Sequence, residues 1–239
     1  SVTLESGTIL GTGDSGTVVN IEGSSASLTV SGGAIWGNVS KSNATGMVLI
    51  SEGCTLNLKG GVLSSRFLHA IRNNGGGRVT MTGGSVTVGG SGAYALDNYG
   101  TAEISGGTLT NSDVRTAVHA VADSSGAIST TTLSGSVICK GDIQVDGSMT
   151  AGSTMNKAEL AISSGTINGS VNVGSFSKVA LSGGTFAGGV EETPGTSQGN
   201  EISVTGGIYP QKPDDAYLAG DALVILAKSQ FYVGEDAEK

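Results

Sequence analysis

The sequence of 239 residues has little charge, little proline, few aromatic side chains and few cysteines. Only 13% of its residues are charged, against about 25% in a typical soluble domain. With 3 prolines, and with glycines that follow no three-residue period, the chain does not form a collagen triple helix. No apolar run reaches the roughly 18 residues that a membrane span needs, so no transmembrane segment is predicted. Two cysteines cannot form a disulfide framework.

The charges that are present are mostly acidic and give a formal net charge of −8 at pH 7. Binding to nucleic acid needs a basic face that replaces the counterions around the phosphates, so a nucleic-acid partner is excluded. Histidine and cysteine occur twice each, and their spacing matches no metal site. The sequence therefore predicts no cofactor and no metal site built from histidine and cysteine. Calcium at acidic turns stays open as an alternative, although no RTX-type nonapeptide occurs.

Glycine is the abundant residue, with 41 copies, and serine and threonine are common beside it. These residues are poor helix formers, which argues against a helical protein. The chain is nevertheless 37% apolar, which is too much for a disordered low-complexity segment. The remaining class is a β-rich fold in which glycine has a structural role.

A repeat of 19 to 29 residues runs through the chain, and each copy has an apolar anchor directly before a turn of Ser, Thr or Gly. Mostly apolar residues recur two positions before the anchor and five positions after it, with Ile35, Leu109 and Ile138 among the latter. This pattern is typical of a strand that points alternately inward and outward. The nine anchors are Leu4, Val30, Leu58, Met81, Ile104, Leu133, Ile162, Leu181 and Val204.

Between the anchor and the next inward residue lie two positions that hold Gly in most copies and Ser in the others. Examples are the pairs Gly32-Gly33 and Gly106-Gly107. Adjacent glycines permit positive φ and a close approach of backbones, where a Cβ atom would clash. Each copy is therefore expected to form a strand, a glycine bend and a second inward strand.

A unit this short cannot bury its own apolar face, but stacked copies bury a continuous column. The predicted fold is all-β: a parallel β-helix of about nine coils over residues 1–209. A cap made of a short helix and a hairpin is predicted over residues 210–239. Because Val2 and Leu4 already lie in register, further chain or a neighbouring domain is expected to cover the N-terminal end. Asn73 and Asn98 hold matching positions and suggest a stack of paired amides.

The chain resembles the β-helical repeats of large surface-exposed, adhesin-like proteins of gut-type Gram-positive bacteria. Residues 94–108 and 204–207 match their ISGGT-type turns and N-x-G segments, and residues 215–224 are similar to their closing A-Y-L-A-D-G-Y-A-L-V segment. The resemblance covers nearly the whole chain. It implies a right-handed, pectin-lyase-like topology and an extracellular, cell-attached, often adhesive role.

An enzyme of the pectin-lyase-like fold would gather acids and basic residues on one outward face. The candidates in this chain are predicted to be scattered singly, and the paired-Asp, R-I-K and H-G signatures of pectinases are absent. His69 and His119, about two coils apart, are expected to be isolated, and Cys54 and Cys139 to be unpaired thiols because they lie about three coils apart. The candidate charged residues are Asp97, Asp113, Asp123, Asp142 and Asp146 with Arg66, Arg72, Arg115 and Lys140.

The sequence therefore predicts a non-enzymatic extracellular protein of the adhesin type, secreted or held at the cell surface, that binds or displays a surface to a host protein or glycan. Trp36, Tyr94 and Tyr99 are the candidate binding residues, because outward aromatic rings stack on sugars. The loops at residues 39–45, 111–125 and 150–157 are expected to carry specificity, since insertions in a solenoid gather at one face. The alternatives are a polysaccharide lyase or glycoside hydrolase, and a passive structural stalk.

Overall fold

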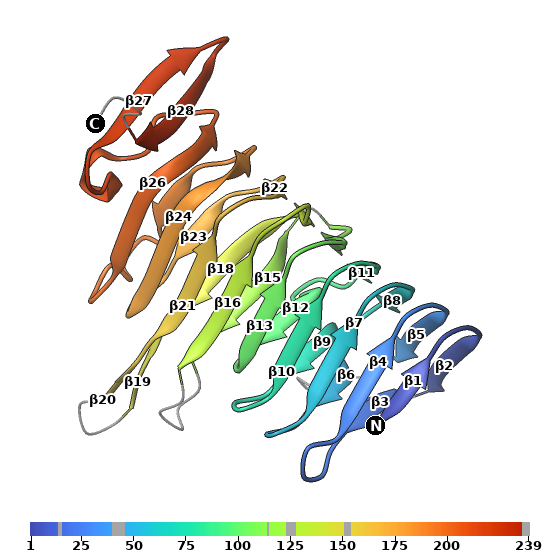
Figure 1. Ribbon diagram of the computed structural model, residues 1–239. Helices are drawn as coiled ribbons and strands as arrows, with labels where there is room; N and C mark the ends of the chain where they lie inside the picture. The colour runs from blue at the N-terminus through green and yellow to red at the C-terminus, as the bar shows by residue number, and fades with distance from the viewer. Residues whose placement is uncertain (14–15, 40–45, 114, 123–127, 151–153, 236–239) are drawn as a thin grey trace.

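The computed structural model describes residues 1–239 except 14–15, 40–45, 114, 123–127, 151–153 and 236–239. It confirms an all-β parallel solenoid in which successive coils stack along one axis (Figure 1). The coils run from the N-terminal strands at one end to a hairpin at the other. Each coil contributes one strand to each of three faces, which we call the first, second and third face.

The strands of each face are parallel and pair with their counterparts in the neighbouring coils. The first face contains β1 (Val2–Leu4), β4 (Ser27–Val30), β7 (Thr55–Leu58), β10 (Arg78–Met81), β13 (Thr101–Ile104), β16 (Ser129–Leu133), β21 (Ala158–Ile162), β24 (Ser177–Phe186) and β26 (Glu201–Tyr209). The second face contains β2 (Thr8–Gly13), β5 (Ala34–Val39), β8 (Val62–Ser65), β11 (Ser85–Val88), β14 (Thr108–Asn111), β17 (Ile138–Lys140), β22 (Thr166–Ile167) and the ends of β24 and β26. The third face contains β3 (Val19–Ile21), β6 (Gly46–Ile50), β9 (His69–Asn73), β12 (Leu96–Asn98), β15 (Thr116–Val121), β18 (Asp142–Asp146), β23 (Val171–Val173) and β25 (Val190–Glu192).

The predicted anchors form one continuous column on the first face. Leu4 pairs with Val30, Val30 with Leu58, and the series continues through every anchor to Val204. From Val30 onward these anchors are fully buried. The repeat therefore determined the register of this face correctly.

One residue of the second inward column was assigned wrongly. Leu109 pairs with Cys139, not with Ile138, and Cys139 is buried whereas Ile138 is 37% exposed. The cause is the turn after the anchor Leu133, where the additional residue Val137 is buried before the next strand begins. The longer turn shifts the following strand by one position, which reverses the side that each residue faces.

The solenoid has about seven turns, fewer than the nine coils predicted. The prediction counted anchors, which mark strands of the first face and not closed turns. In the described part of the chain the third face contains eight strands, and the last strand of the first face, β26, pairs with the C-terminal hairpin and not with a further coil. The strands at the two ends therefore contribute less than complete turns.

The glycine pairs are required by the close stacking of the coils. A Cβ atom on Gly106 would lie 2.5 Å from the carbonyl oxygen of Thr82 in the preceding coil, and Gly83 and Gly183 meet equivalent carbonyls. The second glycine of the pair, as at Gly107, has a positive φ of 86°. A side chain at the first position would push the coils apart, and one at the second would strain the backbone.

The expected amide stack exists inside the third face. The Asn73 Nδ2 atom donates a hydrogen bond of 2.8 Å to Asn98 Oδ1, and Asn98 Nδ2 donates one of 2.8 Å to Thr131 Oγ1. All three side chains are buried. Hydrogen bonds offset the cost of placing polar groups inside the solenoid, so this ladder links three coils.

The C-terminal segment contains a 3-10 helix over Asp215–Tyr217 and a hairpin of β27 (Ala222–Ala227) and β28 (Gln230–Glu235). The Asp214 carboxylate accepts the N–H of Ala216 at 2.9 Å, which satisfies a free donor at the helix start. β28 pairs with β26 in the antiparallel sense, so the hairpin extends the sheet at the end of the stack (Figure 1). A further antiparallel pair, β19 (Ser148–Thr150) and β20 (Thr154–Asn156), interrupts the repeat.

No helix in the described residues is long and apolar enough to cross a membrane.

Candidate functional site

The outer surface of the second face carries a groove of about 450 Å³. One row of its lining consists of Leu10, Trp36, Ser64 and Thr87, which pair with one another on β2, β5, β8 and β11. The groove therefore follows the solenoid axis across several coils. The described residues that line it are Leu10, Trp36, Gly37, Asn38, Ser64, Ser65, Arg66, Thr87, Gly89 and Ser112.

Trp36 is the largest side chain in this groove. Its neighbour Ile35 is fully buried in the core, whereas Trp36 is 49% exposed, which confirms the outward direction expected from the alternation of β5. The residues around the indole are mainly small, hydroxylated or amide-bearing. A flat apolar ring among hydrogen-bonding groups is suited to a ligand with both apolar and polar faces.

Arg66, directly after β8, carries the positive charge among the described residues of the groove. Its backbone N–H donates to the carbonyl of Gly37 at 3.0 Å and so continues the ladder between the two coils. Its guanidinium carbon lies 4.9 Å from the centre of the Phe67 ring, in a cation–π contact. The contact holds the cation beside the groove without neutralising its charge.

A second concentration of functional groups lies on the outer surface of the third face. Arg72, Asp97, His119 and Gln144 pair in register on β9, β12, β15 and β18. We call these residues, together with His69, Tyr94, Tyr99 and Asp146, the Asp97 cluster. The expectation that the histidines and the charged residues are isolated was therefore wrong.

Asp97 is the centre of this cluster, and its side chain is only 1% exposed. One carboxylate oxygen lies 2.5 Å from Arg72 Nη1, and the other lies 2.9 Å from His119 Nδ1. His119 Nε2 lies 3.1 Å from Asp146 Oδ2, and Asp146 Oδ1 accepts a hydrogen bond from Gln144. A continuous ionic network thus links four coils.

The protonation states of the cluster follow from these contacts. Burial lowers the pKa of His119, but the hydrogen bonds and charges of Asp146 and Asp97 outweigh burial and raise the pKa to about 9. Burial alone would raise the pKa of Asp146, but the hydrogen bonds from His119 and Gln144 outweigh burial, and the net pKa is lowered. At neutral pH His119 is therefore a cation that donates from both nitrogens.

His69 has the opposite protonation state and is neutral at neutral pH. Burial is the main cause that lowers its pKa. Its Nδ1 accepts the backbone N–H of Tyr94 at 3.0 Å, which places the remaining proton on Nε2, 3.6 Å from Asp97. Neither histidine thus has a free nitrogen to remove a proton from a substrate, as a general base must.

Tyr94 and Tyr99 belong to this cluster, whereas Trp36 lies on the second face. The Tyr94 ring stacks on His69 with centroids 4.9 Å apart and contacts His119 at 4.6 Å. The guanidinium of Arg72 lies 3.9 Å from the centre of the Tyr99 ring. Burial and the charge of Asp97 raise the pKa of both phenols. The two tyrosine rings therefore pack against charged groups of the protein itself.

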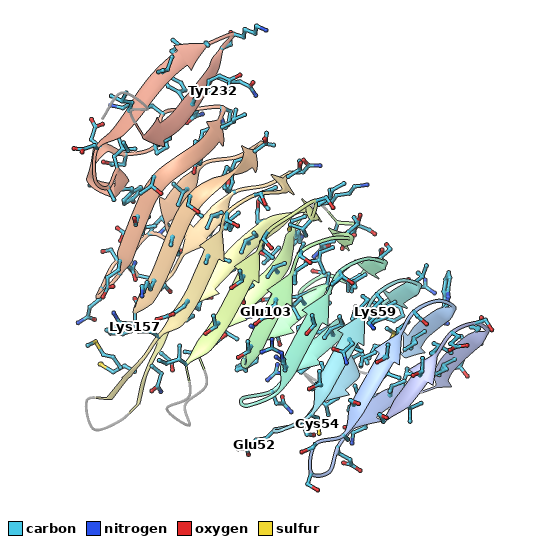
Figure 2. All side chains as sticks on the ribbon, in the orientation of Figure 1. Glu52, Cys54, Lys59, Glu103, Lys157 and Tyr232 are labelled. Atoms are coloured by element: carbon cyan, nitrogen blue, oxygen red, sulfur yellow. The ribbon has the colours of Figure 1, made fainter. Side chains whose placement is uncertain are left out.

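The other charged candidates do not join the cluster. Asp142 accepts the backbone N–H of Ser170 at 2.8 Å. Asp113, Arg115 and Lys140 are exposed, and Asp123 lies outside the described residues. The outer surface of the first face carries pairs such as Arg78 with Glu103, 2.6 Å apart, of which Figure 2 labels Glu103.

The loops predicted to carry specificity fall partly outside the described residues, at 40–45, 114, 123–125 and 151–153. Cys54 and Cys139 are buried free thiols, as expected, and burial raises the pKa of Cys139 to about 12. Cys139 is therefore a poor nucleophile.

In comparisons with known proteins, no family model, no curated protein and no solved structure matches the chain.

Proposed function

We propose that this chain is a non-enzymatic, extracellular β-solenoid of the adhesin type that binds a glycan in the groove at Trp36. The exposed indole in a polar groove is the observation that carries the proposal. A sugar ring offers an apolar face to the indole and hydroxyl groups to the surrounding Ser, Thr and Asn side chains. A secreted or surface location rests on the resemblance of the repeats to surface-exposed proteins.

The test compares wild-type protein with Trp36→Ala on a glycan array, followed by titration calorimetry with the best ligand. Removal of a central aromatic contact costs about 2 kcal/mol, which weakens Kd about 30-fold. Leu226→Ala is the matched control, because it also removes an exposed apolar side chain but lies on β27, in the C-terminal hairpin. Equal binding by wild type and Trp36→Ala contradicts the assignment of the groove.

The display of a surface to a host protein is a second form of the same proposal. A host-protein array probed in parallel with the glycan array distinguishes the two ligands. If neither array shows binding, a passive stalk becomes the better description.

A polysaccharide lyase or glycoside hydrolase is the alternative from another class, and the Asp97 cluster is the observation in its favour. The internal pairing of its groups favours a structural role, since both carboxylate oxygens of Asp97 and both nitrogens of His119 already have partners and His69 Nδ1 accepts a backbone N–H. Incubation with polyuronides, followed by detection of unsaturated or reducing ends, tests this alternative. Product formation that Asp146→Asn abolishes would replace the binding proposal with an enzymatic one.

The proposed location is tested with an antibody against the chain on intact cells of the source organism. Labelling of unpermeabilised cells, or recovery of the chain from the medium, supports it. Labelling only after permeabilisation contradicts it.

A further inference from the structure

The groove at Trp36 carries a positive charge, whereas the protein as a whole is acidic. Among the described residues that line the groove, Arg66 is the one with a charged side chain, and the others are neutral polar, apolar or glycine. The protein as a whole has a net charge of −8. A cation placed in the groove of an acidic protein points to recognition of an anion, because the remaining surface repels one.

The charge of Arg66 is available to a ligand. In the described part of the chain Arg72 pairs with Asp97, Arg78 with Glu103, and Lys157 with Glu201, whereas no carboxylate lies within ion-pair distance of Arg66. Its contact is the Phe67 ring, which orients the guanidinium and leaves its N–H groups unneutralised. A planar guanidinium matches a carboxylate or a sulfate ester through two parallel hydrogen bonds.

The position of Arg66 relative to Trp36 defines the shape of the ligand. Trp36 lies on β5, and Arg66 follows β8, the next strand along the same face. Strands of a sheet are about 4.8 Å apart, so the groove from Leu10 in the first coil to Ser112 in the fifth spans roughly 19 Å along the axis. This length suits a short extended chain of several sugar units and exceeds a single ring.

We infer that the groove binds an extended acidic glycan, with one sugar ring stacked on Trp36 and the carboxylate or sulfate of an adjacent unit bound by Arg66. This inference rests on the proposed glycan binding and adds the charge, the length and the residue that recognises the charge. Asn38, Ser64 and Thr87 supply hydrogen bonds to the sugar hydroxyls along the groove.

The experiment uses titration calorimetry of the full chain with three linear oligosaccharides of equal length. The first carries uronic acids, the second is the same chain with its carboxyl groups reduced to alcohols, and the third is that neutral chain with sulfate esters added. We expect at least one of the acidic ligands to bind ten-fold or more tighter than the neutral one. Whichever acidic ligand binds more tightly identifies the anionic group that the groove recognises. Added salt should weaken the acidic ligand selectively.

The variant Arg66→Gln tests the residue, and Arg78→Gln is its control, because Arg78 is an exposed arginine already paired with Glu103. Arg66→Gln should abolish the preference for the acidic ligand and leave the affinity for the neutral oligosaccharide unchanged. Arg78→Gln should retain the preference. Equal binding of acidic and neutral chains by wild type, or a preference that survives in Arg66→Gln, overturns the inference but not the proposed function. Absence of binding to all three ligands and to the glycan array overturns both.

Discussion

The Asp97 cluster provides the sharpest test of how the coils are held together. Replacing Asp97 with Asn keeps the size of the side chain and removes its charge. Arg72 and a protonated His119 then face each other without the carboxylate that separates them, in a site where Asp97 itself is almost inaccessible to solvent. The expected consequence is a large loss of stability.

The magnitude follows from the buried ion pairs. Removing one partner of a buried pair costs about 3–5 kcal/mol, because the remaining charge is left uncompensated. Arg72 and His119 retain a small contact with solvent, so the lower end of the range, about 3 kcal/mol, is expected for Asp97→Asn. For a chain of this size that loss corresponds to a decrease in Tm of roughly 6–12 °C.

The assay is urea unfolding followed by far-UV circular dichroism, combined with hydrogen exchange resolved by peptide. A solenoid can open in parts, so hydrogen exchange shows whether the loss is centred on β9, β12 and β15. Asp113→Asn is the control, because it removes the same charge from an exposed position. It should change the free energy of unfolding by about 0.5 kcal/mol or less. A variant Asp97→Asn as stable as this control would refute the argument that the ionic network holds the coils together.

Two further predictions concern pH and stacking. The pKa of His119 is raised from 6.5 to about 9 on folding, so its contribution to stability is fully present below pH 6.5 and is lost as the pH rises through about 9. Urea titrations across this window should show that the free energy of unfolding falls by about 3 kcal/mol, and His119→Gln should remove this pH dependence. Gly106→Ala places a Cβ atom against the Thr82 carbonyl and should cost about 1–3 kcal/mol in the same assay, whereas Gly189→Ala, where no atom lies within 4 Å, should be nearly neutral. A flat pH profile, or equal stability of the two alanine variants, would contradict these assignments.

The first face was predictable because each of its positions is repeated with the same distance to its anchor. Alternation places the anchors inside, and the glycine pairs mark the bend, so residue type and spacing carry the same information in every coil. On the second face the prediction was wrong at Ile138, because the turn after Leu133 contains one buried residue more than the repeat allows. A single extra residue reverses the direction of every side chain that follows in the strand.

The Asp97 cluster was missed although a signal for it was present. The alignment that suggested the Asn73–Asn98 ladder places Ile71 and Leu96 in one inward column. The residues one position later, Arg72 and Asp97, then share the outward column, and the same reading one coil further leads to His119. Separation along the chain does not measure distance between coils, so residues 22 to 25 positions apart, such as Arg72, Asp97 and His119, lie side by side.

The sequence by itself determined the class of fold, the inward column of anchors and the outward direction of Trp36, because these follow from a local pattern that every copy repeats. Only the tertiary structure decided which outward side chains meet. The turns between faces differ in length from coil to coil, so the register of the third face is set by backbone pairing between coils. For this reason Tyr94 and Tyr99, which resembled Trp36 in the sequence, pack around a buried carboxylate, whereas Trp36 remains in an open groove beside Arg66.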